Sequence, residues 1–241
     1  MKKIALIPAR YAATRFPAKL LQPLGNKSVI RTTYENTVAT QLFDEVIVIT
    51  DSELIYDEII KHGGKVLYSN NKHESGSDRI AEACEFIKCD VVVNVQGDEP
   101  FVRKEPLEKL LKTFEDENVQ VASLMQVLTD EKLITDPNYV KVAVDKNFNA
   151  LFFSRSVIPY KRDENFTPTY YEHIGVYAFR KQALMNFTKW EMTPLEKAEK
   201  IECLRYLENG ISLKMVVTEY FGVEIDTPED LVKANEFLNK Q

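Results

Sequence analysis

A chain of 241 residues can form one large domain with a full core, or one domain that carries a smaller lobe. Its 44% hydrophobic and 28% charged residues are ordinary for a globular protein, and its net charge of −6 argues against a general binder of nucleic acid or of membrane surfaces. The N-terminal apolar run ends at Pro8, too early for a signal peptide or a membrane span. Three cysteines without metal-ligand spacing indicate reduced thiols, so we expect a cytoplasmic protein.

The segment from Lys3 to Lys19 is the most informative part of the chain. An apolar strand over residues 3–8 leads into a loop that carries three cations, Arg10, Arg15 and Lys19. Ligands of α/β folds bind beyond the carboxyl ends of the strands, and three cations on one loop repel each other unless an anion is bound. A polyphosphate fits, because arginine grips phosphate with a planar fork and lysine binds it as a point charge. The alternative is a solvated basic loop.

Apolar strands alternate with amphipathic helices through the first half of the chain. The strand-like runs cover residues 3–8, 46–50, 65–68, 91–95 and 119–125, and the helix-like runs cover residues 28–40, 53–62, 77–88 and 105–116. The run over residues 91–95 lacks polar alternation, which is typical of a strand covered on both faces. This order predicts an α/β fold with a mainly parallel sheet and right-handed crossovers.

The pattern changes near residue 138. Two strands, residues 139–145 and 150–154, flank a polar turn and predict a hairpin. The remaining elements are expected to be strands at 172–180 and 212–217 and helices at 194–208 and 228–239. We therefore expect residues 1–241 to form a single domain, a nucleotide-binding core into which a β-rich lobe, mostly residues 138–180, is inserted.

Asp98 follows the strand 91–95 within the sequence Gln96-Gly97-Asp98-Glu99-Pro100. This position directs a carboxylate into the same crevice as the basic loop. Bound triphosphates usually need a hard divalent cation, and Mg²⁺ typically takes one or two protein carboxylates beside phosphate oxygens. Asp98 is therefore the first candidate metal ligand. The alternative is that Asp98 only begins a turn before Pro100.

Asp226 precedes the start signal of a helix. Thr227 fits the N-cap, Pro228 the first helical position, and Asp230 the partner of a capping box. Asp226 lies just outside this cap, is not needed for it, and is a candidate second metal ligand. The alternative is that the whole segment serves only to cap the helix.

The sequence Glu74-Ser75-Gly76-Ser77-Asp78-Arg79 also precedes a helix-like run. Ser75 and Asp78 are spaced as in a capping box, and the free N–H groups at such a start can bind an anion or a base edge. Arg79 in the first turn opposes the helix dipole, which suggests that this cation has another role.

His173, Gly175 and Tyr177 share one face of a predicted strand, because side chains alternate along a strand. Gly175 would let a ligand approach the backbone between the two rings. At a rise of about 3.3 Å per residue, His173 and Tyr177 would be roughly 13 Å apart, which suits a long substrate rich in hydroxyls. The alternative is a structural histidine.

Several common reaction classes are not indicated by the sequence. It contains no Gly-x-Gly-x-x-Gly or Walker A motif, no Gly-x-Ser-x-Gly elbow and no Cys/His metal cluster. A dinucleotide oxidoreductase or a P-loop kinase is therefore not expected. A catalytically silent nucleotide-binding protein remains the alternative from a different class, and it requires Asp98 and Asp226 to be idle.

Taken together, these segments resemble the 3-deoxy-manno-octulosonate (Kdo) cytidylyltransferases, also called CMP-Kdo synthetases. The similarity runs essentially from end to end. It rests on six segments in order: Ile7–Lys19, Glu74–Arg79, Val93–Pro100, Phe153–Pro159, His173–Tyr177 and Asp226–Asp230. The resemblance implies a Rossmann-like nucleotidyltransferase core with a small β-rich dimerisation lobe, a homodimer, and the Mg²⁺-dependent reaction of CTP with Kdo to give CMP-Kdo and diphosphate for lipopolysaccharide.

The resemblance also implies roles for individual residues. The triphosphate would be held by Arg10, Arg15 and Lys19, with Arg10 and Lys19 also counted as catalytic. The nucleotide would be surrounded by Ser75, Arg79 and Gln96, and Mg²⁺ would be held by the catalytic residues Asp98 and Asp226. The sugar site would be lined by Arg155, His173, Tyr177 and Glu202.

Two positions depart from the pattern expected of this family. Ala18 stands where glycine is common, and Cys203 stands where glutamine is common beside Glu202. The second change removes an amide that could hydrogen-bond the sugar, so 8-amino-Kdo or another sugar acid remains an alternative substrate.

Overall fold

The structure is a computed structural model that describes residues 1–12, 16–69, 71, 76–219 and 223–239. The chain divides into two compact units. Unit 1 comprises Met1–Leu107 and Phe221–Gln241, and unit 2 comprises Glu108–Tyr220. The metal-ligand candidates fall in unit 1, whereas the four predicted sugar-site residues fall in unit 2, as do residues 138–180.

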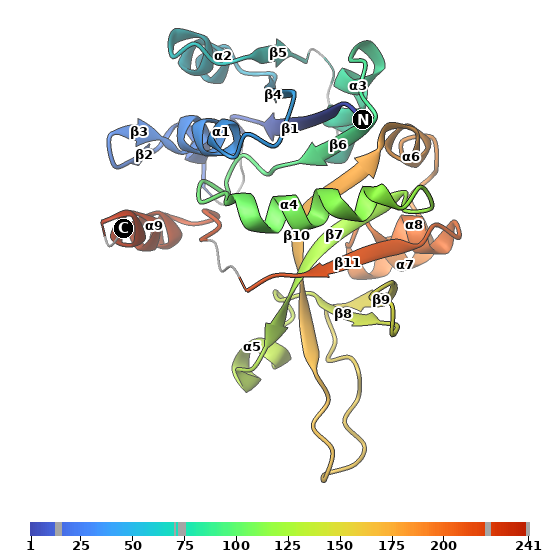
Figure 1. Cartoon of the computed structure of the whole chain (residues 1–241). Helices are drawn as coiled ribbons and strands as arrows, with labels where there is room; N and C mark the ends of the chain where they lie inside the picture. Colours follow the sequence, from blue (N-terminus) through green and yellow to red (C-terminus); the bar gives the residue numbers. More distant parts are fainter. Residues whose placement is uncertain (13–15, 70, 72–75, 220–222, 240–241) are drawn as a thin grey trace. The chain divides into compact units, whose positions relative to one another are not determined.

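Unit 1 contains a parallel sheet in the order β6-β1-β4-β5, which confirms the predicted α/β class (Figure 1). Its strands are β1 (Lys3–Ala9), β4 (Glu45–Thr50), β5 (Val66–Tyr68) and β6 (Val91–Asn94). Every residue of β6 is buried, as expected for a strand without polar alternation. Burying a valine or isoleucine side chain contributes about 1.5–3 kcal/mol, so these central strands fix the edge from which the loops of the candidate site leave.

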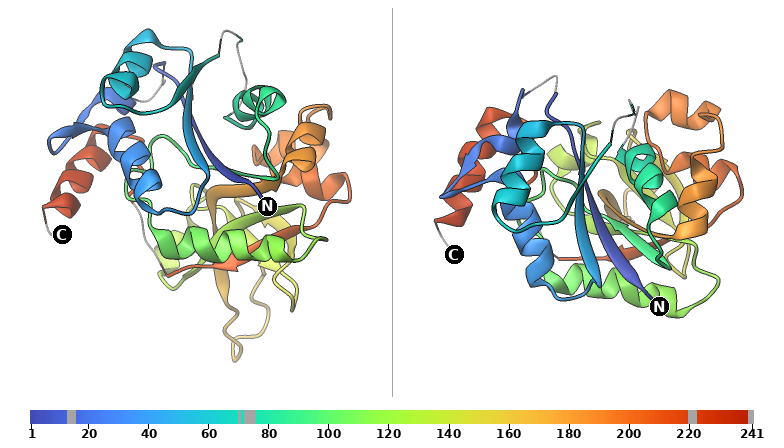
Figure 2. Two further views of the ribbon diagram at one scale, coloured as in Figure 1. Left: turned by 45° about the horizontal axis from the view of Figure 1, so that its top comes forward. Right: turned by 90° about the horizontal axis from the view of Figure 1, so that it is seen from above.

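Helices cover both faces of this sheet. Figure 2 shows α1 (Val29–Ala39) and α2 (Glu53–Lys61) on one face and α3 (Gly76–Phe86) on the other. This placement follows from right-handed crossovers, because the chain steps outward from β1 to β4 and β5 and then returns to β6 on the other side.

The loop that follows β1 leads to a short 3₁₀ helix, Lys19–Leu21. A small hairpin comes next, formed by the two-residue strands β2 (Pro23–Leu24) and β3 (Lys27–Ser28). The C-terminal helix α9 (Pro228–Leu238) packs against this hairpin. The backbone N–H of Gly25 donates to Asn235 Oδ1 at 2.9 Å. The ring of Phe237 also meets that of Phe101 edge to face at 4.7 Å. These contacts fix the helix that begins directly after Asp226.

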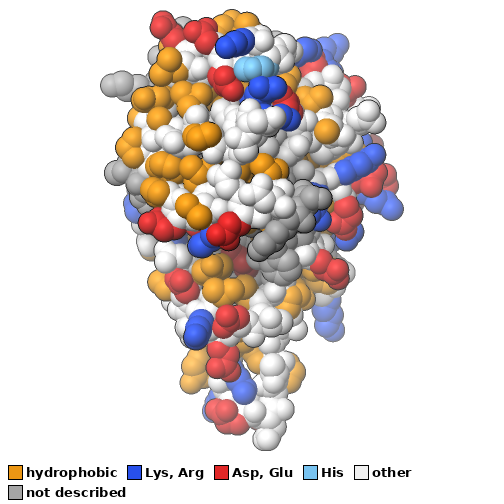
Figure 3. Space-filling view, turned by 90° about the vertical axis from the view of Figure 1, so that its left-hand side faces the viewer, with side chains coloured by type: hydrophobic (Ala, Val, Ile, Leu, Met, Phe, Trp, Pro, Cys, Tyr) orange, Lys and Arg blue, Asp and Glu red, His pale blue; other side chains and the backbone are white. Residues whose placement is uncertain are grey.

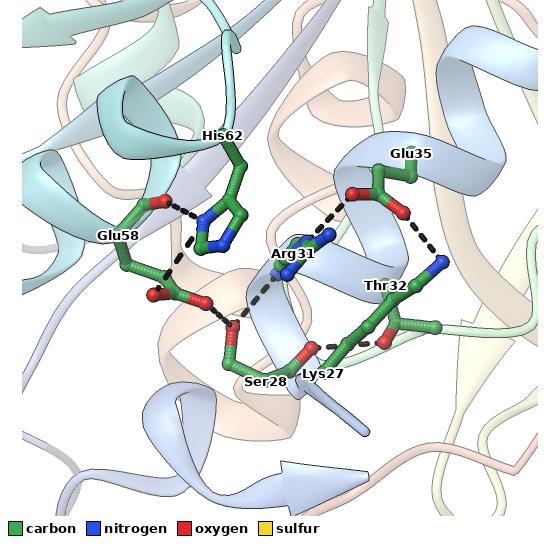
Figure 4. Close-up of polar contacts among 7 residues, drawn as sticks. All are labelled: Lys27, Ser28, Arg31, Thr32, Glu35, Glu58 and His62. Atoms are coloured by element: carbon green, nitrogen blue, oxygen red, sulfur yellow. Dashed lines mark hydrogen bonds and ion pairs between the residues drawn. The ribbon is translucent and has the colours of Figure 1, made fainter. Parts of the chain in front are cut away.

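Ser28 fixes the start of α1 (Figure 4). Its hydroxyl accepts a hydrogen bond from the backbone N–H of Arg31 at 3.3 Å and donates to Glu58 of α2 at 2.7 Å. Such an N-cap is worth about 1 kcal/mol. Glu35 pairs with both Lys27 and Arg31 at 2.6 Å. The hairpin that follows Lys19 is thus anchored to two helices.

Unit 2 is built on three long strands. In this unit β7 (Val121–Leu128) lies between β11 (Leu213–Val217), to which it is parallel, and β10 (Tyr170–Arg180), to which it is antiparallel. The predicted hairpin is confirmed as β8 (Lys141–Val144) paired with β9 (Ala150–Ser154), and Lys141 of β8 also pairs with Glu172 of β10. The segment between β9 and β10 extends as an arm beyond the hairpin (Figure 1).

The prediction of a single helix over residues 194–208 is wrong. This segment is divided into α7 (Pro194–Glu199) and α8 (Leu204–Glu208), because Lys200 adopts a left-handed conformation with φ 56°. A left-handed residue ends a helix. The turn is stabilised across the break by Arg205, whose guanidinium donates to both carboxylate oxygens of Glu196 at 2.6 and 2.7 Å.

The helix expected over residues 105–116 is shorter as well. It consists of α4 (Lys104–Lys112) followed by a 3₁₀ turn, Thr113–Glu115. Two short helices, α5 (Glu131–Thr135) and α6 (Lys181–Phe187), were not predicted, because five to seven residues give too little periodicity to detect.

Acidic, basic and apolar side chains are intermixed on the face drawn in Figure 3. Among the described residues, none of the helices combines the length and the hydropathy needed to cross a membrane.

Candidate active site

The carboxyl edge of the unit 1 sheet gathers the predicted nucleotide residues that the structure describes. Arg10 is exposed directly after β1, and Gln96 comes shortly after β6. Arg79, in the first turn of α3, is 5% exposed and donates through Nη2 to Asp51 at the end of β4, at 2.6 Å. Its Nη1 is buried and has no hydrogen-bond partner among the residues that the structure describes. A buried donor without a partner is uncommon, and a role of this cation toward the nucleotide stays a prediction.

Gln96 lies beside the start of α3. Its Oε1 is 4.0 Å from the position that a Cβ on Gly76 would take. The loop after β6 and the N-terminus of α3 are thus neighbours at the edge where a nucleotide is expected. Arg15 and Ser75 lie outside the described residues.

The loop that carries Asp98 is packed tightly against the core of unit 1. A Cβ on Gly97 would come within 3.1 Å of the Pro8 carbonyl oxygen and 3.2 Å of Ile30, so any side chain here would crowd this close approach. Thr33 of α1 donates to the Gly97 carbonyl at 2.9 Å, and Asn36 donates to that of Pro100 at 2.7 Å. Asp98 is therefore held on a rigid support.

Asp98 and Asp226 are brought together, as predicted. The backbone N–H of Ile225 donates to the Asp98 carbonyl at 3.0 Å, so the two segments run side by side. The predicted capping box then fixes the chain direction, since Thr227 and Asp230 exchange side-chain and backbone hydrogen bonds at the start of α9. Asp226 consequently lies outside the cap and beside Asp98.

Lys19 joins the two aspartates. Its ammonium group lies 2.5 Å from Asp98 Oδ2 and 2.7 Å from Asp226 Oδ1, and all three side chains are at most 27% exposed. Burial lowers the pKa of Lys19, but Asp98 and Asp226 raise it by more, so the net pKa is raised and the lysine stays charged. A cation thus binds between these carboxylates in the protein itself.

Ala18, one of the two departures from the family pattern, lies directly before Lys19 in an unfavourable backbone conformation. Ala18 has φ 54° and ψ 24°, in the left-handed region. Glycine adopts this conformation freely, whereas a residue with a Cβ loses roughly 1–2 kcal/mol. Ala18 keeps the backbone turn that directs Lys19 toward the aspartates, at this conformational cost.

Glu224 is a third carboxylate at this point, and the sequence reasoning missed it. One oxygen each of Asp98, Glu224 and Asp226 lie within 4.8 Å of one another. The signal was available, since residues two apart in extended chain project to the same side, and Glu224 is two residues before Asp226. Three clustered carboxylates can hold a hard divalent cation.

Glu99 is a buried carboxyl group next to this cluster. Burial, with the charges of Glu224 and Asp98, raises the pKa of Glu99 to about 8. Glu99 therefore keeps its proton near neutral pH mainly because it is buried, and the neighbouring carboxylates add to the effect.

In unit 2, His173 and Tyr177 are much closer than the predicted 13 Å, and that distance is wrong. Their ring centroids are 5.2 Å apart. The reason is an irregularity in β10. Ile174 pairs with Leu124 of β7, but the next pair is Tyr177 with Ser123. Two extra residues in β10 shorten the path between the rings, as in a β-bulge. A Cβ on Gly175, inside the bulge, would meet no atom within 4 Å.

Arg155 is tied to its own unit. Its Nε donates to the Glu199 carbonyl at 2.8 Å, and its Nη1 donates to the Pro137 carbonyl at 2.9 Å. Its backbone N–H also donates to the Glu199 carboxylate at 2.9 Å. These bonds use two of the five guanidinium N–H donors, so the second N–H of Nη1 and both N–H groups of Nη2 are left for a sugar acid.

Glu202 and Cys203 lie at the turn between α7 and α8, next to Tyr177. Burial, together with the nearby Cys203 thiol and Glu202 carboxylate, raises the pKa of Tyr177 well above its ordinary value. Cys203 is 1% exposed. The structure thus brings His173, Tyr177 and Glu202 into one neighbourhood, and Cys203 contacts Tyr177 there.

The family described as Cytidylyltransferase matches residues 4–216. The chain is 56% identical over 241 residues to a protein of Flavobacterium johnsoniae named 3-deoxy-manno-octulosonate cytidylyltransferase, with 99% of each chain covered. It is 43% identical, with full coverage of both chains, to the protein of that name from Bacteroides thetaiotaomicron.

Two solved structures share the fold. One is described as CMP:2-keto-3-deoxy-manno-octonic acid synthetase complexed with CTP, with a TM-score of 0.95, 33% identity and coverage of 100% of this chain and 99% of the other. The second is a 4-diphosphocytidyl-2C-methyl-D-erythritol synthase from Anaerococcus prevotii, with a TM-score of 0.65, 18% identity and 99% coverage of both chains. At that identity the second likeness concerns the fold alone.

Proposed function

The chain belongs to the 3-deoxy-manno-octulosonate cytidylyltransferase family, and we propose that it transfers CMP from CTP to Kdo, releasing diphosphate and supplying CMP-Kdo for lipopolysaccharide biosynthesis. The observation that carries this proposal is the 56% sequence identity between this chain and a relative of that name, over 99% of both chains. The names of these relatives do not favour the alternative substrate, 8-amino-Kdo.

The residues of unit 1 fit Mg²⁺. Asp98, Asp226 and Glu224 offer hard oxygen ligands within 4.8 Å of one another, and Lys19 already binds there as a cation. Mg²⁺ prefers such a site, with a few carboxylates and the remaining positions left to water and phosphate oxygens. When bound, Mg²⁺ would withdraw charge from the phosphates and orient the attacking hydroxyl. Asp98 and Asp226 would be its primary ligands.

Lys19 would change partners when the substrate binds. In the structure its ammonium group neutralises Asp98 and Asp226. A divalent cation would take over that neutralisation and leave Lys19 to turn to the triphosphate, where it would join Arg10 and Arg15. These three cations would then offset the charge that develops on the departing diphosphate.

The chemistry would be an in-line displacement. The anomeric C2 hydroxyl of Kdo attacks the α-phosphorus of CTP and gives up its proton to water, a new C–O–P link forms, and the bond to the diphosphate breaks. The enzyme contributes positioning and charge neutralisation, as is usual for transfers at phosphorus. Arg155, His173, Tyr177 and Glu202 would bind the sugar acid, and Arg79 and Gln96 would lie around the nucleotide.

The experiment that tests this proposal is a steady-state assay of diphosphate release with CTP and Mg²⁺ against a panel of acceptors. We expect Kdo to give a kcat/KM at least tenfold above those of 8-amino-Kdo and neuraminic acid. Preference for another sugar acid would change the assigned substrate. Metal-dependent binding of CTP without turnover of any acceptor would favour a catalytically silent nucleotide-binding protein.

A homodimer held by the β-rich lobe is also part of the proposal. Its support is the exposure of large apolar side chains in unit 2, which a partner subunit would cover: Val127 at 41%, Leu151 at 62%, Tyr160 at 84% and Phe166 at 64%. Light scattering after gel filtration should give a mass of twice 27.8 kDa. A cytoplasmic location agrees with the lack of a disulfide at Cys84, Cys89 and Cys203, all of which the structure describes, and would be checked by cell fractionation.

A further inference from the structure

Ser123 of β7 lies against the irregular part of β10. Its side chain is fully buried. Its hydroxyl oxygen is 3.0 Å from His173 Nε2, 3.1 Å from the Ile174 carbonyl oxygen and 2.9 Å from the Val176 carbonyl oxygen. One hydroxyl therefore meets a ring nitrogen and two carbonyl groups at the point where β10 carries its extra residues.

The number of protons available decides the direction of these hydrogen bonds. A serine hydroxyl has one proton and two lone pairs, whereas a carbonyl oxygen can only accept. The hydroxyl proton is therefore needed by Ile174 or Val176. His173 Nε2 is then satisfied only if it carries a proton and donates to the serine oxygen. The reverse arrangement would withdraw the hydroxyl from both carbonyl groups.

The remaining nitrogen of His173 is consequently an acceptor. Burial lowers the pKa of His173 to about 4, so the ring is neutral at pH 7. A neutral imidazole with its proton on Nε2 has a lone pair on Nδ1. Within the described part of the chain, no hydrogen-bond partner faces Nδ1. The ring itself is held between Phe153, at 5.0 Å, and Tyr177, at 5.2 Å.

We propose that Ser123 is a positioning residue that holds His173 in the Nε2–H tautomer, so that Nδ1 accepts a hydrogen bond from a hydroxyl group of the sugar acid. The inference rests on the proposed function for the presence of the sugar. It assigns His173 to a hydroxyl of the substrate and not to its carboxylate, because a neutral ring with a free lone pair repels an anion and attracts a donor. Ser123 itself touches no substrate.

The first test is the tautomer of His173 in the free protein, which does not depend on any activity. Long-range proton–nitrogen correlation spectra of ¹⁵N-histidine-labelled protein contain three ring systems, and His173→Gln identifies the relevant one. At pH 7 we expect Nε2 to have the shift of a protonated nitrogen and Nδ1 that of an unprotonated one. A proton on Nδ1, or on both nitrogens, would overturn the proposal.

The second test separates positioning from a merely structural role. We expect Ser123→Ala to raise the KM for Kdo about tenfold while the KM for CTP changes less than twofold, and to mix the two tautomers of His173 in the spectrum. Ser123→Thr keeps the hydroxyl and should restore both the KM, to within threefold, and the single tautomer. Equal losses for both substrates, or no rescue by threonine in a folded protein, would show that Ser123 only supports the strand.

Different results would contradict the proposed function and the proposed role of Ser123. If the wild-type protein consumes no sugar acid, the proposed function and the assignment of a sugar hydroxyl to Nδ1 are both wrong. If it consumes Kdo but the proton is on Nδ1, the function stands and the role of Ser123 is wrong.

Discussion

An oxygen of Asp98 and an oxygen of Asp226 lie within 4.8 Å of each other, although these residues are separated by more than half of the chain. The loop after β6 and the segment before α9 are joined by the hydrogen bond from the Ile225 N–H to the Asp98 carbonyl. The pair is therefore built by the backbone, and it does not depend on the flexible side chain of Lys19. Two anchored carboxylates are suited to share one cation.

Asp98→Asn should lower kcat by about 100-fold or more, a loss of roughly 2.7 kcal/mol in stabilisation of the transition state. The reason is that asparagine keeps the shape of the side chain but not the charge that holds the metal. Asp57→Asn, on the exposed surface of α2, is the matched control and should retain full activity. The midpoint of thermal unfolding should stay within a few degrees in both variants. An Asp98→Asn enzyme with wild-type turnover would remove Asp98 from the mechanism.

Glu224→Gln should weaken binding of the divalent cation about tenfold, because the affinity of a hard cation rises with the number of charged oxygen ligands. Mn²⁺ titrated into the protein and followed by electron paramagnetic resonance measures this directly, without turnover. Glu229→Gln, in the first turn of α9, is the control with the same change in total charge. Equal affinities in the wild type and Glu224→Gln would show that Glu224 is not a ligand.

His173 should make stability depend on pH. Its pKa in the folded protein, about 4, is below the ordinary value of 6.5, so the unfolded chain binds more protons between these values. The resulting stabilisation is fully present above pH 6.5 and is lost as the pH falls toward 4. Relative to His173→Gln, the wild type should lose about 2 kcal/mol of unfolding free energy between pH 7 and pH 5. Urea denaturation at both pH values measures it, and parallel losses in the two proteins would contradict the assignment.

The ion pair of Glu196 and Arg205 should be important for stability. Both side chains are at most 10% exposed, and the guanidinium carbon of Arg205 also lies 4.0 Å from the ring centre of Phe187. Glu196→Gln would leave a buried charge without its counterion, which costs about 3 kcal/mol or more. The exposed pair of Lys161 and Glu164 provides the control, since Glu164→Gln should cost less than about 0.5 kcal/mol. Urea denaturation of both variants tests the difference, and equal small losses would show that the buried pair is dispensable.

Local signals in the sequence predicted much of unit 1. The alternation of apolar strands and helices specified the parallel sheet, and the order Thr227, Pro228, Asp230 specified the start of α9 down to its capping box. Asp98 could be placed at a ligand-binding edge because it directly follows a buried strand. These inferences succeeded since the relevant interactions are close in sequence or follow from general rules of α/β folds.

Two of the features that were missed, the bulge in β10 and the break at Lys200, have no local signal in the sequence. The bulge in β10 lies against Ser123 of β7, whose hydroxyl is within hydrogen-bond distance of the Ile174 and Val176 carbonyl groups, so the distance between His173 and Tyr177 could not be obtained from strand geometry alone. The helix break at Lys200 contains no glycine or proline from which it could have been predicted. Its turn is stabilised instead by the ion pair of Glu196 and Arg205.

Release of diphosphate from CTP in the presence of Mg²⁺ and Kdo, measured for the wild type and for Asp226→Asn, tests the central claim most directly. We predict that the wild type releases one diphosphate for each Kdo consumed, that a chelator abolishes the reaction, and that Asp226→Asn loses at least about 100-fold in kcat while remaining folded. Turnover by Asp226→Asn at the wild-type rate, or turnover that continues after removal of divalent cations, would contradict a cation shared by Asp98 and Asp226.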